Sequence, residues 1–392
     1  MSTRVPAHAT PALIEWARRK AGFSRDVIAR KLKVNESLIE QWESGARKPT
    51  IKQLRRFGEA VHRPLAFFYL PSPPQDFDAI RDFRHVADVE PGSESPELLL
   101  AIRSAHTNRS LALDLMEDLG ETPDTNIPTA GLGDDPESLG STIRTDLGCE
   151  TQIQSRWSSF YAALNFWRSA VEGKGILVMQ FGDVNRIEAR GFSMADFPLP
   201  IIAVNRAEWP QARIFSIIHE LVHLMLRQGG LCNFIEHNGG VAQDEQLEVF
   251  SNRVAGAALV PRDDLLSDPI MNSQRPGRDF EEQDIVALSR RFRVSREVIL
   301  RRLLIFDIVT RQFYESKRSQ YERELEQTRG PSEGFAPPHA LALSTAGPLF
   351  TGLVIRSYQQ HRITAADVAE YLNLRLKHLP RVQDSLLALM SS

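Results

Sequence analysis

An apolar helix with two histidines four residues apart constrains this 392-residue chain more than any other part of its sequence. The pattern predicts the helix over residues 211–227, with His219, Glu220 and His223 in its second half. Residues four apart on a helix lie on one face, one turn above the other, which lets both imidazoles grip a single metal ion. Burying two imidazoles and a carboxylate in so apolar a helix is costly without a partner, and a metal ion supplies one.

The residue types in this pattern favour Zn²⁺ and hydrolytic chemistry. Catalytic zinc sites have three protein ligands and leave one position open for water. His219 and His223 are the predicted ligands, and Glu220 is the predicted general base that takes a proton from that water. The alternative is that both histidines are core residues satisfied by hydrogen bonds and that Glu220 only completes this arrangement.

A third ligand is expected from a second helix, predicted over residues 244–259. Glu248 is the predicted ligand, and Asn252 lies one turn later, where it would support a ligand by a hydrogen bond. Glu245 is instead expected to face solvent, and the alternative for Glu248 is that it too is a solvent-facing helix charge. His237 is a rival ligand, although the spacing H-E-x-x-H-x-x-G-x-x-H, which brings in a third histidine, is not met in this chain.

These residues resemble the ImmA/IrrE family of zinc metallopeptidases over about residues 155–305. The resemblance rests on the helix around His219, on the strand Pro200–Asn205, and on the pattern from Glu248 to Pro261. It implies that His219, His223 and Glu248 bind zinc and that Glu220 is catalytic. It also implies a zincin-like, minigluzincin α+β domain and a protein substrate, such as a DNA-binding repressor.

The N-terminal region is predicted to be a separate helical module. It resembles the phage-repressor-like (XRE-type) helix-turn-helix family over residues 11–69, including the signature W-E-x-G-x-R-x-P from Trp42 to Pro49. The resemblance implies that residues 35–44 enter the major groove of DNA. The alternative is a module kept for protein contact or homodimer formation, because Glu36 and Glu40 place negative charge on that helix. The candidate DNA-binding residues are Arg25, Asn35, Ser37, Gln41, Arg47, Lys48 and Lys52.

Charge and cysteine content indicate the cellular environment of the chain and where its basic surface lies. Residues 1–70 hold 14 Lys and Arg against 6 Asp and Glu, so a chain of net charge -3 has its basic surplus in the N-terminal module. Two cysteines cannot build a disulfide framework, which favours a reducing cytoplasm. The sequence also lacks a signal segment and a run of eighteen apolar residues, so no membrane contact is expected.

The predicted fold is mostly α, with a small mixed or antiparallel sheet. Strands are expected at 176–181, 187–192 and 201–204, and a linker at 329–340. The other expected helices are 96–119, 137–148, 152–172, 281–292, 295–305, 307–327, 348–360, 364–373 and 381–390. The expected domains are a helix-turn-helix domain (1–74), a helical connecting region (75–150), the peptidase domain (151–306) and a helical C-terminal region (307–392).

The sequence leaves undecided the role of one further segment and the choice between two functions. Residues 285–303 resemble a second helix-turn-helix, whose arginines would bind nucleic acid or a substrate repressor, or simply be solvated. The leading hypothesis is a zinc endopeptidase and transcriptional regulator that cleaves a specific partner. The opposing hypothesis is a DNA-binding regulator whose metal site senses a ligand or is structural, without physiological proteolysis.

Overall fold

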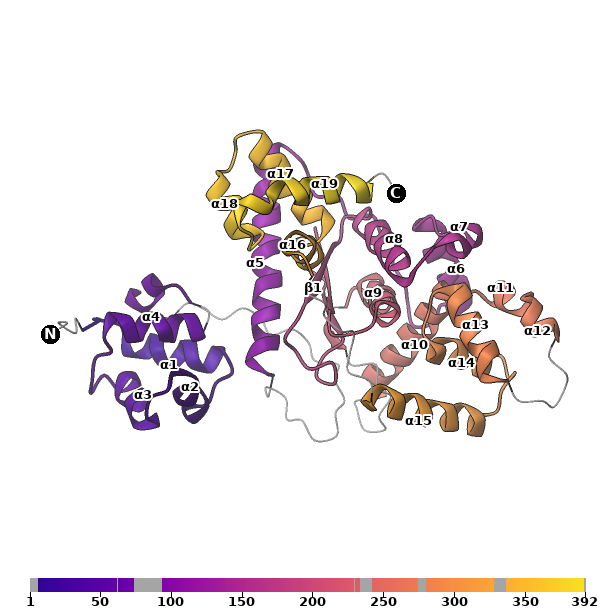
Figure 1. Cartoon of the computed structure of the whole chain (residues 1–392), viewed down its shortest axis with the longest axis horizontal. Coiled ribbons are helices and arrows are strands. Elements are labelled where there is room, and N and C mark those ends of the chain that lie inside the picture. The colour runs from indigo at the N-terminus through magenta and orange to yellow at the C-terminus, as the bar shows by residue number, and fades with distance from the viewer. Residues whose placement is uncertain are drawn as a thin grey trace. The chain divides into compact units, whose positions relative to one another are not determined.

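The computed structural model describes residues 6–61, 63–73, 94–228, 230–232, 242–273, 280–327 and 336–390 (Figure 1). These residues form two compact units, one made of residues up to 73 together with 94–104 and the other starting at residue 105. Both units are mostly helical, and the larger one contains a small sheet. The predicted fold class is therefore confirmed.

The N-terminal unit is a bundle of short helices with its own core. Ile39 and Trp42 are buried, and Phe57 and Phe68 pack edge to face beside them. Asn35 and Thr50 cap two of the helices by accepting hydrogen bonds from backbone N–H groups of the first turn. Its elements are α1 (Pro11–Lys20), α2 (Arg25–Leu32), α3 (Glu36–Glu43), α4 (Ile51–Ala60) and the 3₁₀ helix η1 (Leu65–Tyr69), followed by the first turns of α5 (Pro96–Leu119).

The sheet of the larger unit has the strand order β1-β3-β2-β4. Its strands are β1 (Leu177–Phe181), β2 (Gly191–Met194), β3 (Ile201–Asn205) and β4 (Gly230–Cys232). The pairing of β1 with β3 is parallel, whereas β2 pairs antiparallel with both β3 and β4. Every residue of β1, β2 and β3 is buried, which explains their nearly continuous apolar sequence.

Helix α9 (Pro210–Met225) packs against β2 and β3 and is the centre of the larger unit. Pro210 occupies its first turn, where the missing N–H is not needed, and almost all later residues are buried. Helix α10 (Ala242–Leu259) lies against α9 and α6. The surrounding helices are α6 (Pro136–Asp146), α7 (Thr151–Arg156), α8 (Phe160–Glu172), α11 (Arg262–Leu266), α12 (Pro269–Ser273), α13 (Glu282–Phe292), α14 (Arg296–Ile305) and α15 (Arg311–Gln327).

The C-terminal helices dock on α8 and β1 through hydrogen bonds of two buried charged side chains, Arg168 and Glu172. The Arg168 guanidinium donates to the carbonyl oxygens of Val178 and Ser344, and Glu172 accepts from the backbone N–H of Leu349. Burial raises the pKa of Glu172 to about 7. The docked elements are α16 (Pro338–Ala346), α17 (Pro348–Gln359), α18 (Ala365–Tyr371), η2 (Leu376–His378) and α19 (Leu379–Met390).

Membrane-spanning character is weak in the part of the chain that the structure describes. There, no single helix is long and apolar enough to cross a bilayer. The pair α16 and α17 reaches the required length and composition only when taken together, across a bend of 107°.

Several sequence expectations needed correction. The predicted strand at 187–192 was misplaced, since Ile187 is 63% exposed in a turn and β2 begins at Gly191. The predicted helix 152–172 is two helices, because Trp157 has an extended backbone that ends α7. The linker predicted for 329–340 ends earlier, since Pro338 begins α16, and residues 328–335 lie outside the described residues.

Gly347 provides a test of the C-terminal docking. It has φ of +93°, and an added Cβ would lie 2.7 Å from both Glu172 Oε1 and the Val178 carbonyl oxygen. We expect Gly347→Ala to lower the free energy of unfolding by about 1–3 kcal/mol more than Gly120→Ala, measured by urea unfolding. Gly120 is the matched control, because its φ is +71° but an added Cβ would meet nothing within 4 Å. Equal losses in the two variants would contradict this account.

Candidate metal centre

Three buried side chains converge where α9 crosses α10. The Nε2 atoms of His219 and His223 are 2.9 Å apart. Glu248 on α10 completes the group, with carboxylate oxygens 3.3 Å from His219 Nε2 and 3.2 Å from His223 Nε2. One ligand atom from each residue lies within 4.8 Å of the others. The structure thus brings together the three residues predicted from sequence.

These residues fit a zinc ion by chemistry and by spacing. Tetrahedral ligands at about 2.0–2.1 Å from Zn²⁺ lie roughly 3.3 Å from one another, close to the observed separations. Both imidazoles are fully buried, and Glu248 is nearly so. Burying these polar groups costs free energy unless a partner compensates for their lost hydration. A divalent cation is such a partner.

The electrostatics of the group also fit a cation. Burial lowers the pKa of His219 to about 4, so this imidazole is neutral near pH 7. Although burial opposes the effect, His219 and His223 hold the pKa of Glu248 well below its usual range. The same contact raises the pKa of His223 against the opposing effect of burial. An ionised carboxylate beside imidazole nitrogens is a donor set that zinc prefers.

Glu220 is buried next to these residues, and a strand of the sheet holds its carboxylate in position. The Ser193 hydroxyl on β2 donates to Glu220 Oε2 at 2.7 Å. Gly191 on the same strand lies so close that an added Cβ would be 3.2 Å from Glu220 Oε1. Sequence reasoning missed both residues. The available signal was a glycine and a serine, two residues apart and therefore on one face of a strand, in an otherwise apolar run.

Asn252 lies one turn beyond Glu248 and is 3% exposed. Its side chain is beside His219, where it contributes to raising the pKa of that imidazole against the larger effect of burial. Its amide nitrogen and oxygen nevertheless form no hydrogen bond of ordinary geometry with the described residues. Glu245, one turn before Glu248, is half-buried and is not part of the ligand group. His237, the rival ligand, lies outside the described residues.

The candidate DNA-binding residues occupy different environments in the N-terminal unit. Arg25 is half-buried and its Nε donates to Glu43, which also binds the buried Arg18. Asn35 uses its side-chain oxygen to cap α3 at the N–H of Ser37. Lys48 is exposed and lies 3.0 Å from His8 Nδ1. Of the remaining candidates, Ser37, Arg47 and Lys52 are exposed and Gln41 is half-buried.

The arginines of residues 285–303 mostly have structural partners. Arg302 is buried and forms a two-point ion pair with Glu137. Arg296 binds Glu282 and Glu324, and Arg293 donates to the Trp157 carbonyl oxygen. These contacts fix α13 and α14 within the larger unit, so their arginines belong largely to the fold.

Comparison with known protein families assigns a class to this part of the chain. Residues 172–304 match the family of IrrE N-terminal-like domains, Peptidase_M78. The matched segment contains β1 to β4, α9 and α10, and therefore the whole ligand group and Glu220. No curated protein matches the chain. The segment thus has a metallopeptidase-like fold, built around a group of residues that fits a metal ion.

Removal of one ligand tests the metal centre. We expect Glu248→Gln to weaken zinc binding by more than the roughly 10–100-fold that loss of an outer-shell partner costs. Zinc content after equilibration with a competing chelator, measured by elemental analysis, gives the result. Glu245→Gln is the matched control, since it makes the same change on the same helix outside the ligand group. Loss of zinc from both variants, or from neither, would argue against this assignment.

Proposed function

We propose that this protein is a zinc-dependent endopeptidase and transcriptional regulator that cleaves a specific partner protein in the cytoplasm. The N-terminal unit binds DNA in this proposal, and a DNA-binding repressor is the class of substrate that it favours. The match of residues 172–304 to a peptidase family supports the hydrolytic part.

The observation that carries the proposal is the position of Glu220. In the described part of the chain, the ligand group contains three residues, and Glu220 lies next to it without belonging to it. A structural zinc site normally uses four protein ligands and has no need of a further buried carboxylate. A hydrolytic site needs both an open position and a base.

Each residue then has a defined task. When bound, zinc supplies Lewis acidity that polarises a peptide carbonyl and makes a water molecule more acidic. Glu220 accepts the proton of the attacking water and passes it to the amine that leaves. Ser193 holds the Glu220 carboxylate by its hydrogen bond to Oε2, so the base keeps one orientation.

Glu220→Gln distinguishes hydrolysis from a sensing or structural metal site. We expect this variant to keep zinc and to lose at least about 100-fold in cleavage rate, because general-base catalysis contributes about 10²–10⁴-fold. Cleavage is measured on repressor-type proteins encoded beside this gene, incubated with the zinc-loaded chain.

The control for this substitution is Glu245→Gln, which should cleave like the wild type. Cleavage that persists in Glu220→Gln would refute the assigned base. Regulation of the neighbouring genes that is unchanged in the same variant would favour the sensing or structural site.

The DNA-binding part rests on charge and exposure in the N-terminal unit. Arg47, Lys48 and Lys52 are exposed on or beside α4, and the first 70 residues carry the basic surplus of the chain. Such cations bind phosphates and make affinity depend on salt. Glu36 and Glu40 are exposed on α3, so contact with bases there would involve carboxylates, which accept from cytosine N4.

The double variant Arg47→Ala and Lys48→Ala tests this part. We expect weaker binding to mixed-sequence duplex DNA and a salt dependence whose slope falls by about 0.9 for each phosphate that these side chains no longer neutralise. Fluorescence anisotropy over a salt series measures both. Arg311→Ala, which removes an exposed arginine from the larger unit, should leave the slope unchanged. A slope that is the same in all three proteins would exclude these two residues from DNA contact.

A further inference from the structure

A cavity of about 360 Å³ lies beside the metal centre and is not used by the chemistry above. Residues of α9, α10, α13, α14 and α15 line it. Two of them connect it to the ligand group: Phe215 lies one turn before His219, and Asn252 lies one turn after Glu248. The ring centroids of Phe215 and His219 are 6.1 Å apart. The cavity therefore shares a wall with the metal centre.

Asn252 contributes a buried amide to the wall of this cavity. It is almost completely buried and lies beside His219, yet neither amide atom has a hydrogen bond of ordinary geometry within the described residues. A buried amide in this state is unfavourable unless something else binds it. A peptide group is its complement, because the Asn252 Nδ2–H can donate to a carbonyl oxygen while Oδ1 accepts from an N–H.

Aromatic and aliphatic side chains form an apolar part of the wall, beside charged and polar ones. Phe160, Trp209 and Phe215 contribute aromatic rings, and Val298 adds an aliphatic surface. Cavities of about 300–1,000 Å³ that combine an apolar surface with placed polar groups are typical of ligand sites. An apolar side chain of a bound peptide is the group that this surface would remove from water.

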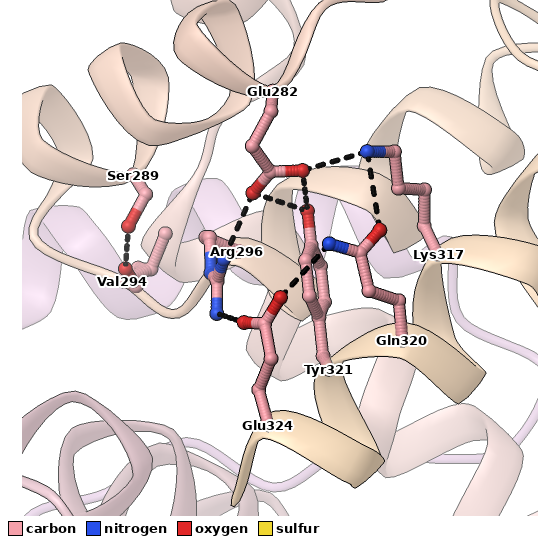
Figure 2. Close-up of polar contacts among 8 residues, drawn as sticks. All are labelled: Glu282, Ser289, Val294, Arg296, Lys317, Gln320, Tyr321 and Glu324. Carbon is pink, nitrogen blue, oxygen red and sulfur yellow. Dashed lines mark hydrogen bonds and ion pairs between the residues drawn. The ribbon is translucent and has the colours of Figure 1, made fainter.

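A polar network, drawn in Figure 2, joins α13, α14 and α15 and includes the lining residues Arg296 and Tyr321. Arg296 donates to Glu282 at 2.8 Å and to Glu324 at 2.6 Å, and its guanidinium lies 4.0 Å from the ring centroid of Tyr321. The Tyr321 hydroxyl donates to Glu282, as does Lys317. Two carboxylates thus balance the charge of Arg296. This arginine therefore contributes to the cavity wall and is not available to bind an anionic ligand.

Arg290 differs from the other arginines that line the cavity. Arg190 and Arg301 pair with Glu208 and Glu297, respectively. Arg290 is exposed on α13 at the edge of the cavity and forms no ion pair with the described residues. A carboxylate on a ligand would find its complement there.

We propose that this cavity is the substrate-selecting pocket of the peptidase: it binds a peptide whose apolar side chain enters between the aromatic walls and whose neighbouring acidic residue meets Arg290. Asn252 binds the backbone of the same peptide. This assignment rests on the proposed function and names its substrate class.

The test uses the zinc-loaded full chain and a synthetic random-sequence peptide mixture, with cleaved bonds identified by mass spectrometry. Ala212→Phe fills the cavity from α9, and Ala287→Phe places the same group on the exposed face of α13 as its control. Arg290→Glu reverses the rim charge, with Arg311→Glu as its control. Asn252→Leu removes the buried amide.

The wild type is expected to prefer peptides with an apolar and an acidic residue at fixed positions. Ala212→Phe should lower kcat/KM for these peptides about 10–100-fold and lose the apolar preference, while zinc content and Tm stay unchanged. Arg290→Glu should replace the acidic preference by a basic one. Asn252→Leu should lower cleavage of all peptides alike and keep its zinc. Preferences that Ala212→Phe and Arg290→Glu leave unaltered would overturn the pocket, and loss of zinc in Asn252→Leu would assign that residue to the metal centre instead.

Capture by Glu220→Gln separates this inference from the proposed function. The zinc-loaded variant should retain peptides of the same apolar and acidic class from the mixture, and adding Ala212→Phe should abolish retention. If the variant retains these peptides but the wild type cleaves none, the pocket is supported and the proposed peptidase function is refuted. If the wild type cleaves peptides but no class of peptide is preferred or retained, the peptidase function is supported and the proposed pocket is refuted.

Discussion

The contact between the Glu248 carboxylate and two imidazoles determines much of the larger unit. These groups are buried at the crossing of α9 and α10, where none of them is stable without the others or a cation. The two helices therefore have to meet at one separation and one register. Helix α9 is fixed on the sheet and α10 on α6, so the sheet and the helical layer are connected through this contact.

The sheet serves the site as well as the core. Strand β2 lies between β3 and β4, so its position is set by hydrogen bonds on both sides. Glu220 is positioned by this strand in two ways. Ser193 donates a hydrogen bond to its carboxylate, and Gly191, which has no side chain, lets the carboxylate lie close to the strand. A base that is held from a paired strand moves less than one on a loop, which is what proton transfer at a fixed distance requires.

Local patterns predicted those parts of the structure that depend on local spacing. His219, His223 and Glu248 followed from helical periodicity together with a family resemblance, and the helix Pro96–Leu119 followed from its apolar stripe. The strand near Ile187 was misplaced because an apolar residue can be exposed in a turn. A glycine and a serine on one strand face hinted at a role for Ser193, but its contact with Glu220 and the cavity around Asn252 join segments far apart in the chain, which local spacing cannot place.

The metal centre and the cavity are built from the same two helices, which couples them physically. Phe215 and His219 share α9, and Asn252 and Glu248 share α10, each pair separated by a single turn. An ion that fixes the distance between His219 and Glu248 therefore also fixes the separation of Phe215 and Asn252 in the cavity wall. Coupling of this kind is reciprocal in binding free energy. A peptide that fits the cavity should thus tighten the hold on the metal, and the metal should in turn favour that peptide over others.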